Sequence, residues 1–184
     1  MSETDLALRA GLPPHLRVLA DRYTRDGWRA HSNFDSMTRY WLSRHAMFRT
    51  LTDRLLTDAE AFLDGERDVR QYRSRLASDG GTLIQELHMH HGVEDHHYFP
   101  QLIRKAPEVA AAFDILDADH HALDAQLAAL TEAANAALRT ASGDTVGPIH
   151  AVLTKTARFL HRHLSDEEEI VVPIILEHGG QDLA

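Results

Sequence analysis

The chain contains the stretch HHGVEDHHYFP at residues 90–100, and an altered copy of it, HLSDEEEIVVP, at residues 163–173. In both copies a histidine is followed four residues later by a glutamate and ten residues later by a proline. Residues i and i+4 lie on one face of an α-helix, about 40° apart. Each copy therefore presents an imidazole and a carboxylate together, which is how a helix offers two ligands to one metal site. The two pairs are His90 with Glu94 and His163 with Glu167.

A second repeat has almost the same spacing. His45 and His120 lie 75 residues apart, and the two copies of the longer motif lie 73 residues apart. The chain thus reads as a single histidine followed by His-x-x-x-Glu, and then as the same two elements again. This order predicts two similar halves that share one metal centre, with the ligands His45, His90, Glu94, His120, His163 and Glu167.

The composition excludes several classes of protein. The chain has 184 residues and a net charge of −9, without a run of Lys or Arg that would indicate a nucleic-acid or membrane surface. It contains no cysteine, which excludes disulfides, iron–sulfur clusters, thiolate zinc sites and cysteine nucleophiles. The N-terminus does not resemble a secretory signal, and no apolar run approaches the roughly 20 residues needed to cross a bilayer. We therefore expect one cytoplasmic domain.

Apolar residues recur at helical spacing along nearly the whole chain, and no period-two alternation indicates a sheet. A short amphipathic stretch opens at Pro13–Pro14 and ends near Gly27. Four long helices are then predicted from Asn33 to about Asp64, from about Val69 to Lys105, from Pro107 towards Arg139, and from Pro148 to about Glu177. Gly80–Gly81 is expected to weaken the start of the second of them, and Pro100 to mark a kink or a stop in it.

Short connections between long helices favour an all-α, up-down-up-down four-helix bundle. In this interpretation residues 1–32 are a short N-terminal helical extension, residues 33–178 form the bundle, and residues 179–184 are a flexible tail.

The order His, His-x-x-x-Glu, His, His-x-x-x-Glu resembles the hemerythrin-like family, also called HHE cation-binding domains. In each repeat the Glu is followed by an acidic residue, and a Pro stands six residues beyond it. The resemblance covers about residues 33–177. It implies a non-haem centre of two iron ions, oxo- or hydroxo-bridged, inside the bundle. The implied terminal ligands are His45, His90, His120 and His163, and the implied bridging ligands are Glu94 and Glu167.

The sequence departs from the oxygen-carrying hemerythrins at one position. Those proteins have a further His four residues after the third-helix His, where this chain has Asp124. Two six-coordinate ions need about twelve bonds, and the implied ligands with one bridging oxygen leave two positions open. This departure favours catalase-like peroxide turnover over reversible O2 storage. Asp124, His97 and His31 are further candidate ligands, whereas Glu168 and Glu169 are expected to be surface acids.

Several functions compete. The leading prediction is a di-iron protein that binds or reacts with O2, peroxide or nitric oxide, without a nucleic-acid or membrane partner. An O2 or iron sensor or carrier without catalysis is the first alternative. Iron–sulfur-cluster repair is a second, although relatives of that kind carry a cysteine that this chain lacks. A ferritin-like oxidase would need Glu-x-x-His on two helices, and only Glu94–His97 has that spacing. A purely structural bundle is the remaining alternative.

Overall fold

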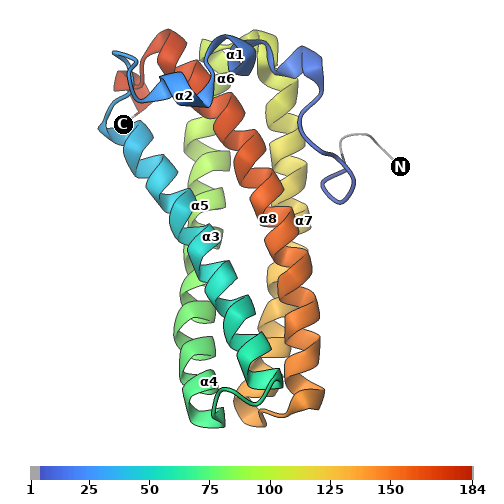
Figure 1. The fold of residues 1–184 in the computed structure, drawn as a ribbon. Coiled ribbons are helices and arrows are strands. Elements are labelled where there is room, and N and C mark those ends of the chain that lie inside the picture. The colour runs from blue at the N-terminus through green and yellow to red at the C-terminus, as the bar shows by residue number, and fades with distance from the viewer. Residues whose placement is uncertain (1–4, 184) are drawn as a thin grey trace. The chain divides into compact units, whose positions relative to one another are not determined.

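A computed structural model describes residues 5–183, and within them it contains helices and no strands (Figure 1). Residues 1–4, part of the N-terminus in which we expected no secretory signal, and residue 184 lie outside the described part. The all-helical class is confirmed, while the up-down-up-down order stays a prediction. The helices are α1 (Val18–Arg22), α2 (Arg25–Trp28), α3 (Ser36–Leu63), α4 (Val69–Arg75), α5 (Gly81–Val93), α6 (Phe99–Lys105), α7 (Ala110–Arg139) and α8 (Gly143–His178).

The chain divides into two compact units, and each long helix contributes to both. Unit 1 comprises the described residues of Met1–Ala46, His91–His120 and His161–Ala184. Unit 2 comprises Met47–His90 and His121–Leu160. The division into extension, bundle and tail that we predicted is a different partition, and it stays a prediction.

Helix α3 begins three residues later than the Asn33 start that we predicted. The Asp35 carboxylate accepts hydrogen bonds from the backbone N–H and the hydroxyl of Thr38, at 2.8 and 2.9 Å, so Asp35 supplies the N-terminal cap. Asn33 instead donates its side-chain N–H to the Leu176 carbonyl at 2.8 Å. The helix ends at Leu63, and Gly65 follows in the left-handed conformation, with φ of +76°, that favours glycine.

The predicted helix from Val69 to Lys105 is confirmed as one continuous helical segment that includes α4, α5 and α6. The segment continues through Gly80–Gly81, which we expected to weaken its start, and Pro100, where we expected a kink or a stop, does not stop it. A wider π-helical turn replaces the α-helix at Leu76–Gly80 and again at Glu94–Tyr98. In the second of these turns the Phe99 N–H donates to the Glu94 carbonyl, five residues back. Such a turn carries one extra residue, so every side chain after it is rotated relative to an α-helix.

The third predicted helix is also confirmed, because Pro107–Val109 forms a single 3-10 turn that leads into α7. Helix α8 begins at Gly143, five residues before the predicted start at Pro148. The Ser142 carbonyl accepts the N–H groups of Thr145 and Val146, at 3.1 and 2.9 Å, and starts the helix there. The N-terminal stretch is broken into a 3-10 turn at Pro14–Leu16 and the short helices α1 and α2.

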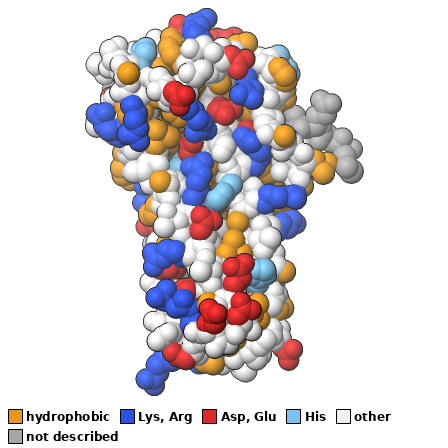
Figure 2. All heavy atoms as spheres, viewed as in Figure 1, with side chains coloured by type: hydrophobic (Ala, Val, Ile, Leu, Met, Phe, Trp, Pro, Cys, Tyr) orange, Lys and Arg blue, Asp and Glu red, His pale blue; other side chains and the backbone are white. Residues whose placement is uncertain are grey.

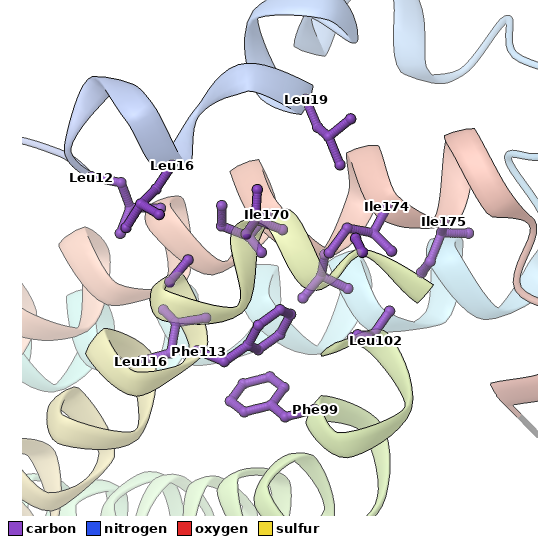
Figure 3. Packing of buried hydrophobic residues seen from close by; sticks show 14 of the residues in the cluster. Leu12, Leu16, Leu19, Phe99, Leu102, Phe113, Leu116, Ile170, Ile174 and Ile175 are labelled. Carbon is purple, nitrogen blue, oxygen red and sulfur yellow. The ribbon is translucent and has the colours of Figure 1, made fainter. Parts of the chain in front are cut away.

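The core of unit 1 joins the N-terminal segment to α6, α7 and α8. Figure 3 shows leucines of the N-terminal segment above isoleucines of α8, with phenylalanines and leucines of α6 and α7 on the other side. The labelled members are Leu12, Leu16, Leu19, Phe99, Leu102, Phe113, Leu116, Ile170, Ile174 and Ile175. We expected a loose tail after Gly179, yet Leu183 is fully buried in this same cluster.

Unit 2 is mainly an aliphatic core. Its fully buried side chains include Leu83, Leu87, Leu123, Leu127 and Leu153. Near one end, the buried carboxylate of Asp58 is paired with Arg67 at 2.8 Å and Arg75 at 3.3 Å.

The surface agrees with the mixed composition of the sequence. Figure 2 shows acidic and basic side chains interspersed over the face in view. Within residues 5–183, the structure contains no helix whose length and apolar character would allow it to cross a membrane.

The N-terminal segment should contribute to stability through its buried leucines. Leu16 is 4% exposed, whereas Leu8 in the same segment is 55% exposed. We expect Leu16→Ala to lower the free energy of unfolding by about 3 kcal/mol, because it removes buried apolar surface and leaves a cavity. Leu8→Ala should change it by less than about 0.5 kcal/mol. Urea unfolding followed by circular dichroism measures both, and equal effects would contradict the observed packing.

Candidate metal centre

Two groups of ligand side chains lie in the interior of unit 1. His91, His120 and His163 form the first, and each is at most 4% exposed. The second contains His45, Glu94 and Glu167, none of them more than 1% exposed. Within each group the potential ligand atoms lie within 4.8 Å of one another. The residues come from α3, α5 and the π turn after it, α7 and α8, so the fold brings four distant parts of the sequence together.

The Nε2 atoms of three histidines face the two glutamates. Nε2 of His45 and Nε2 of His163 are each 3.5 Å from a different oxygen of Glu167. Nε2 of His120 is 3.6 Å from Glu94 Oε2. These separations are longer than a good hydrogen bond. They suit two ligands on one ion, since atoms about 2.1 Å from a metal lie roughly 3–4 Å from each other.

The opposite ring nitrogens of the same histidines are held by buried or partly buried carboxylates. Nδ1 of each imidazole lies 2.8–3.2 Å from a carboxylate oxygen, so that each Nδ1–H can donate and leave Nε2 as the ligand atom. The three pairs are His45 with Glu168 at 3.0 Å, His120 with Asp95 at 2.8 Å, and His163 with Asp119 at 3.2 Å.

Two of these carboxylates follow directly from the sequence repeat. Asp95 comes directly after Glu94, and Glu168 comes directly after Glu167. In each copy the acid after the glutamate holds the single histidine contributed by another helix. Our expectation that Glu168 is a surface acid is therefore wrong, because its carboxylate is 4% exposed and is used by His45. Glu169 is partly exposed and pairs with Arg17 at 3.5 Å.

His91 is a site residue that we did not predict. Its ring stacks on His120, with centroids 4.0 Å apart and planes 11° apart, and it meets the edge of His163 at 5.5 Å. The signal was present in the His90–His91 doublet, because residues three and four positions before Glu94 both lie on its helix face. Only the spacing of four recurs in the second copy, as His163–Glu167, and the repeat therefore selected His90. The side chains of His91 and Glu94, three residues apart, are both buried.

Trp41 has a second role besides the core packing that its apolar side chain favours. Its Nε1–H donates to Glu167 Oε1 at 2.7 Å, and its ring lies against Tyr98 at a centroid distance of 4.9 Å. The oxygen of Glu167 that the indole orients is the one that faces His45, and the other oxygen faces His163.

The charges of the interior are strongly coupled. Burial raises the pKa of Glu94 well above its usual value, and the neighbouring Glu167 carboxylate raises it further. Burial lowers the pKa of His45, but Glu167 and Glu168 more than offset this, so that its pKa is raised. For His163, burial is the largest effect and the nearby His120 adds to it; together they outweigh Asp119, so the pKa is lowered.

The donor set fits a pair of cations. Two buried carboxylates face each other among imidazoles, and this arrangement is costly without positive charge between them. Among the described residues, Nε2 of His120 and Nε2 of His163 are buried and make no hydrogen bond. Imidazole nitrogen and carboxylate oxygen without thiolate suit iron, manganese or zinc.

Three candidate ligands do not join either group. Asp124 and His97 are exposed, and His31 is partly buried, where its Nδ1 accepts the Asn33 N–H at 3.2 Å. His97 does not join the ligand side chains because the π turn at Glu94–Tyr98 rotates it away from the face predicted by α-helical spacing. Asp124 lies on the exposed side of α7, while Leu123 and Leu127 face the core.

His90 lies at the boundary of the units. It is the last residue of the Met47–His90 segment of unit 2, it is partly buried, and its ring packs on Phe48 with centroids 5.1 Å apart. It precedes Glu94 by four residues in a continuous helical segment. Its role as a ligand stays a prediction.

The family model of the hemerythrin HHE cation-binding domain matches residues 36–175. The chain belongs to this family. The match includes all six ligands that the repeat predicts and leaves out the further candidate His31, and the hemerythrin fold class agrees with the all-helical structure. Neither the curated proteins nor the solved structures contain a significant match. Membership of the hemerythrin HHE family supports a cation-binding helical protein, and the family most often binds iron.

Glu167→Ala should lose bound metal, because Glu167 is the carboxylate that two imidazoles face. His97→Ala should retain the metal content of the natural protein, since His97 is exposed. Elemental analysis after gel filtration compares the two variants. Equal retention would show that Glu167 is not a ligand.

The metal-free protein should lose stability as the pH rises. Because the pKa of Glu94 is raised in the folded state, Glu94 keeps its proton above about pH 4.3, where the unfolded chain has released it. The folded state then binds more protons than the unfolded state, so its free energy of unfolding falls with pH until Glu94 ionises. Glu94→Gln should remove this component. Urea unfolding of chelator-treated protein between pH 5 and 8 tests it, and parallel curves for the two proteins would contradict it.

Proposed function

We propose that this protein is a non-haem di-iron protein that binds a small ligand such as O2 or nitric oxide reversibly. The observation that carries the proposal is the buried set of imidazoles, each oriented through Nδ1 by a carboxylate and directed through Nε2 at two glutamates. Iron would supply the redox chemistry and the binding of the small molecule. The protein supplies the orientation of the ligands and the exclusion of bulk water.

The proposed ligands divide into two sets. His91, His120 and His163 would hold one ion, and His45 would hold the other together with His90. For His90 the support is its spacing of one helical turn before Glu94. Glu94 and Glu167 would bridge the ions, because each faces imidazoles and the two carboxylates are neighbours.

Asp124, in place of a further histidine ligand, favoured peroxide turnover over reversible O2 binding. The presence of His91 in the site reverses this preference. Counting His91 with the other imidazoles, the two bridging glutamates and one solvent-derived bridge, about eleven of the roughly twelve coordination positions of two ions are filled. One position would remain, on the ion that His45 and His90 would hold. Oxygen-carrying relatives reach the same number of imidazoles with a second third-helix histidine, which this chain lacks at Asp124. A single open position favours binding of a small molecule over peroxide turnover.

Metal analysis tests the first part of the proposal. The natural protein loaded with iron under anaerobic conditions should contain about two irons per chain. After exposure to air it should show charge-transfer absorption in the near ultraviolet. A single tightly bound zinc, with no such absorption after iron loading, would reject the di-iron proposal.

His91→Ala tests the second part. Removal of this imidazole should open a second coordination position, and we expect the variant to evolve oxygen from added peroxide faster than the natural protein. His96→Ala is the matched control, because His96 is exposed one turn away on the same segment. The natural protein should release O2 under vacuum after binding it in the reduced state. Rapid peroxide turnover by the natural protein, without reversible O2 binding, would favour the peroxide function instead.

A further inference from the structure

The N-terminal segment, residues 5–32, reaches the metal centre through a buried arginine. Arg9 is 8% exposed. Its Nη1–H donates to Asp119 Oδ1 at 2.6 Å, its Nη2–H donates to the other oxygen of Asp119, and its Nε–H donates to Asp166 at 2.8 Å. Asp119 is the carboxylate that faces Nδ1 of His163. One row of contacts therefore leads from Arg9 through Asp119 to His163.

A second arginine of the segment makes an equivalent row on another part of the centre. The Arg25 Nη1–H donates to Glu168 Oε2 at 2.5 Å, and the other oxygen of Glu168 lies 3.0 Å from Nδ1 of His45. Arg25 also donates to the Ser165 carbonyl at 3.0 Å, which places its guanidinium on α8. This row leads from Arg25 through Glu168 to His45.

The two rows end in different ligand groups. His163 belongs to the three-histidine group, and His45 belongs to the group with Glu94 and Glu167. The third oriented imidazole, that of His120, differs from those of His45 and His163. Its Nδ1 contacts Asp95, whose carboxylate is 28% exposed to solvent. The carboxylates paired with the arginines, Asp119 and Glu168, are at most 4% exposed.

The position of these contacts has a chemical consequence. A guanidinium that donates to a buried carboxylate places a positive charge beside it and restrains its orientation, most strongly when it forms two hydrogen bonds. An oriented carboxylate accepts from Nδ1–H of the histidine, which fixes the tautomer and turns Nε2 towards a metal.

We propose that Arg9 and Arg25 are positioning residues for the metal ligands His163 and His45. The N-terminal segment then contributes to metal binding by orienting the carboxylates that hold these histidines. The proposal rests on the proposed function in so far as those histidines bind metal. It predicts that the arginines affect how tightly the metal is held, besides any effect on stability.

The competing interpretation is that the arginines only attach the segment to α8. The chain provides a matched control for this. Arg22, between Arg9 and Arg25 in the sequence, pairs with Glu177 of α8 at 2.8 Å. Glu177 also accepts from the Tyr23 hydroxyl at 2.5 Å, and its contacts are with the segment and not with a ligand histidine. Arg22→Gln therefore removes an attachment of the segment without altering a carboxylate that orients a ligand.

The experiment compares Arg25→Gln, Arg9→Gln and Arg22→Gln, each as the full chain. Each protein is loaded with Co2+, and the loss of Co2+ to an excess of chelator is followed by its visible absorption. We expect the Arg25 and Arg9 variants to release Co2+ about tenfold faster than the natural protein, with a changed spectrum. Arg22→Gln should keep the natural spectrum and release rate, even where its melting temperature falls. Arg25→Lys should release Co2+ at a rate between those of Arg25→Gln and the natural protein. Lysine retains the positive charge but lacks the two guanidinium nitrogens that donate in different directions.

The outcomes separate the two proposals. A natural protein that binds neither Co2+ nor iron rejects the proposed function. A natural protein that binds metal, with equal release rates for Arg25→Gln and Arg22→Gln, rejects the positioning role alone. Arg9→Gln removes the guanidinium from the buried Asp119 and leaves the buried Asp166 paired with Arg162 only, so its folding is checked first by circular dichroism. If Arg9→Gln fails to fold, Arg25→Gln tests the positioning role by itself, because Arg25 is exposed and its substitution leaves no buried guanidinium site empty.

Discussion

The interior of unit 1 is organised around two neighbouring buried carboxylates, Glu94 and Glu167. Negative charges at this depth repel each other and lose hydration, so they require protons, cations or donors close by. The surrounding imidazoles and the indole N–H of Trp41 meet part of this requirement, and the N-terminal segment contributes guanidinium groups one layer further out. These groups compensate the two buried carboxylates only in part, and this is the physical reason to infer that a metal binds between them.

The layers around these carboxylates alternate in charge. Acidic groups at the centre are followed by imidazoles, then by a second ring of acids, and in two places by arginines. His45, His120 and His163 are thereby each held at Nδ1, which restricts their rotation and tautomer. A site arranged in this way is preorganised, since the cost of orienting the ligands is met when the chain folds.

The π turn at Glu94–Tyr98 explains two of the differences between expectation and structure near the site, at His97 and at Pro100. A regular α-helix would direct His90, Glu94 and His97 along one face. The extra residue in the turn leaves Glu94 inside, moves His97 to the surface and allows the helix to continue through Pro100. His91 lies before this turn and stacks on His120; in the proposed centre it would supply the imidazole that the chain lacks at Asp124.

The repeat of His-x-x-x-Glu with its trailing proline was sufficient to predict the helical class, the family, and Glu94, His163 and Glu167 as buried members of the site, because helix periodicity is a local property. The acid that follows each glutamate was also visible, and a comparison of the two copies could have identified Asp95 and Glu168. Contacts between distant segments have no such local signal. The roles of Arg9, Arg25 and Asp119, the stacking of His91 and the burial of Leu183 depend on which helices meet and on one irregular turn, and the tertiary structure alone determines both.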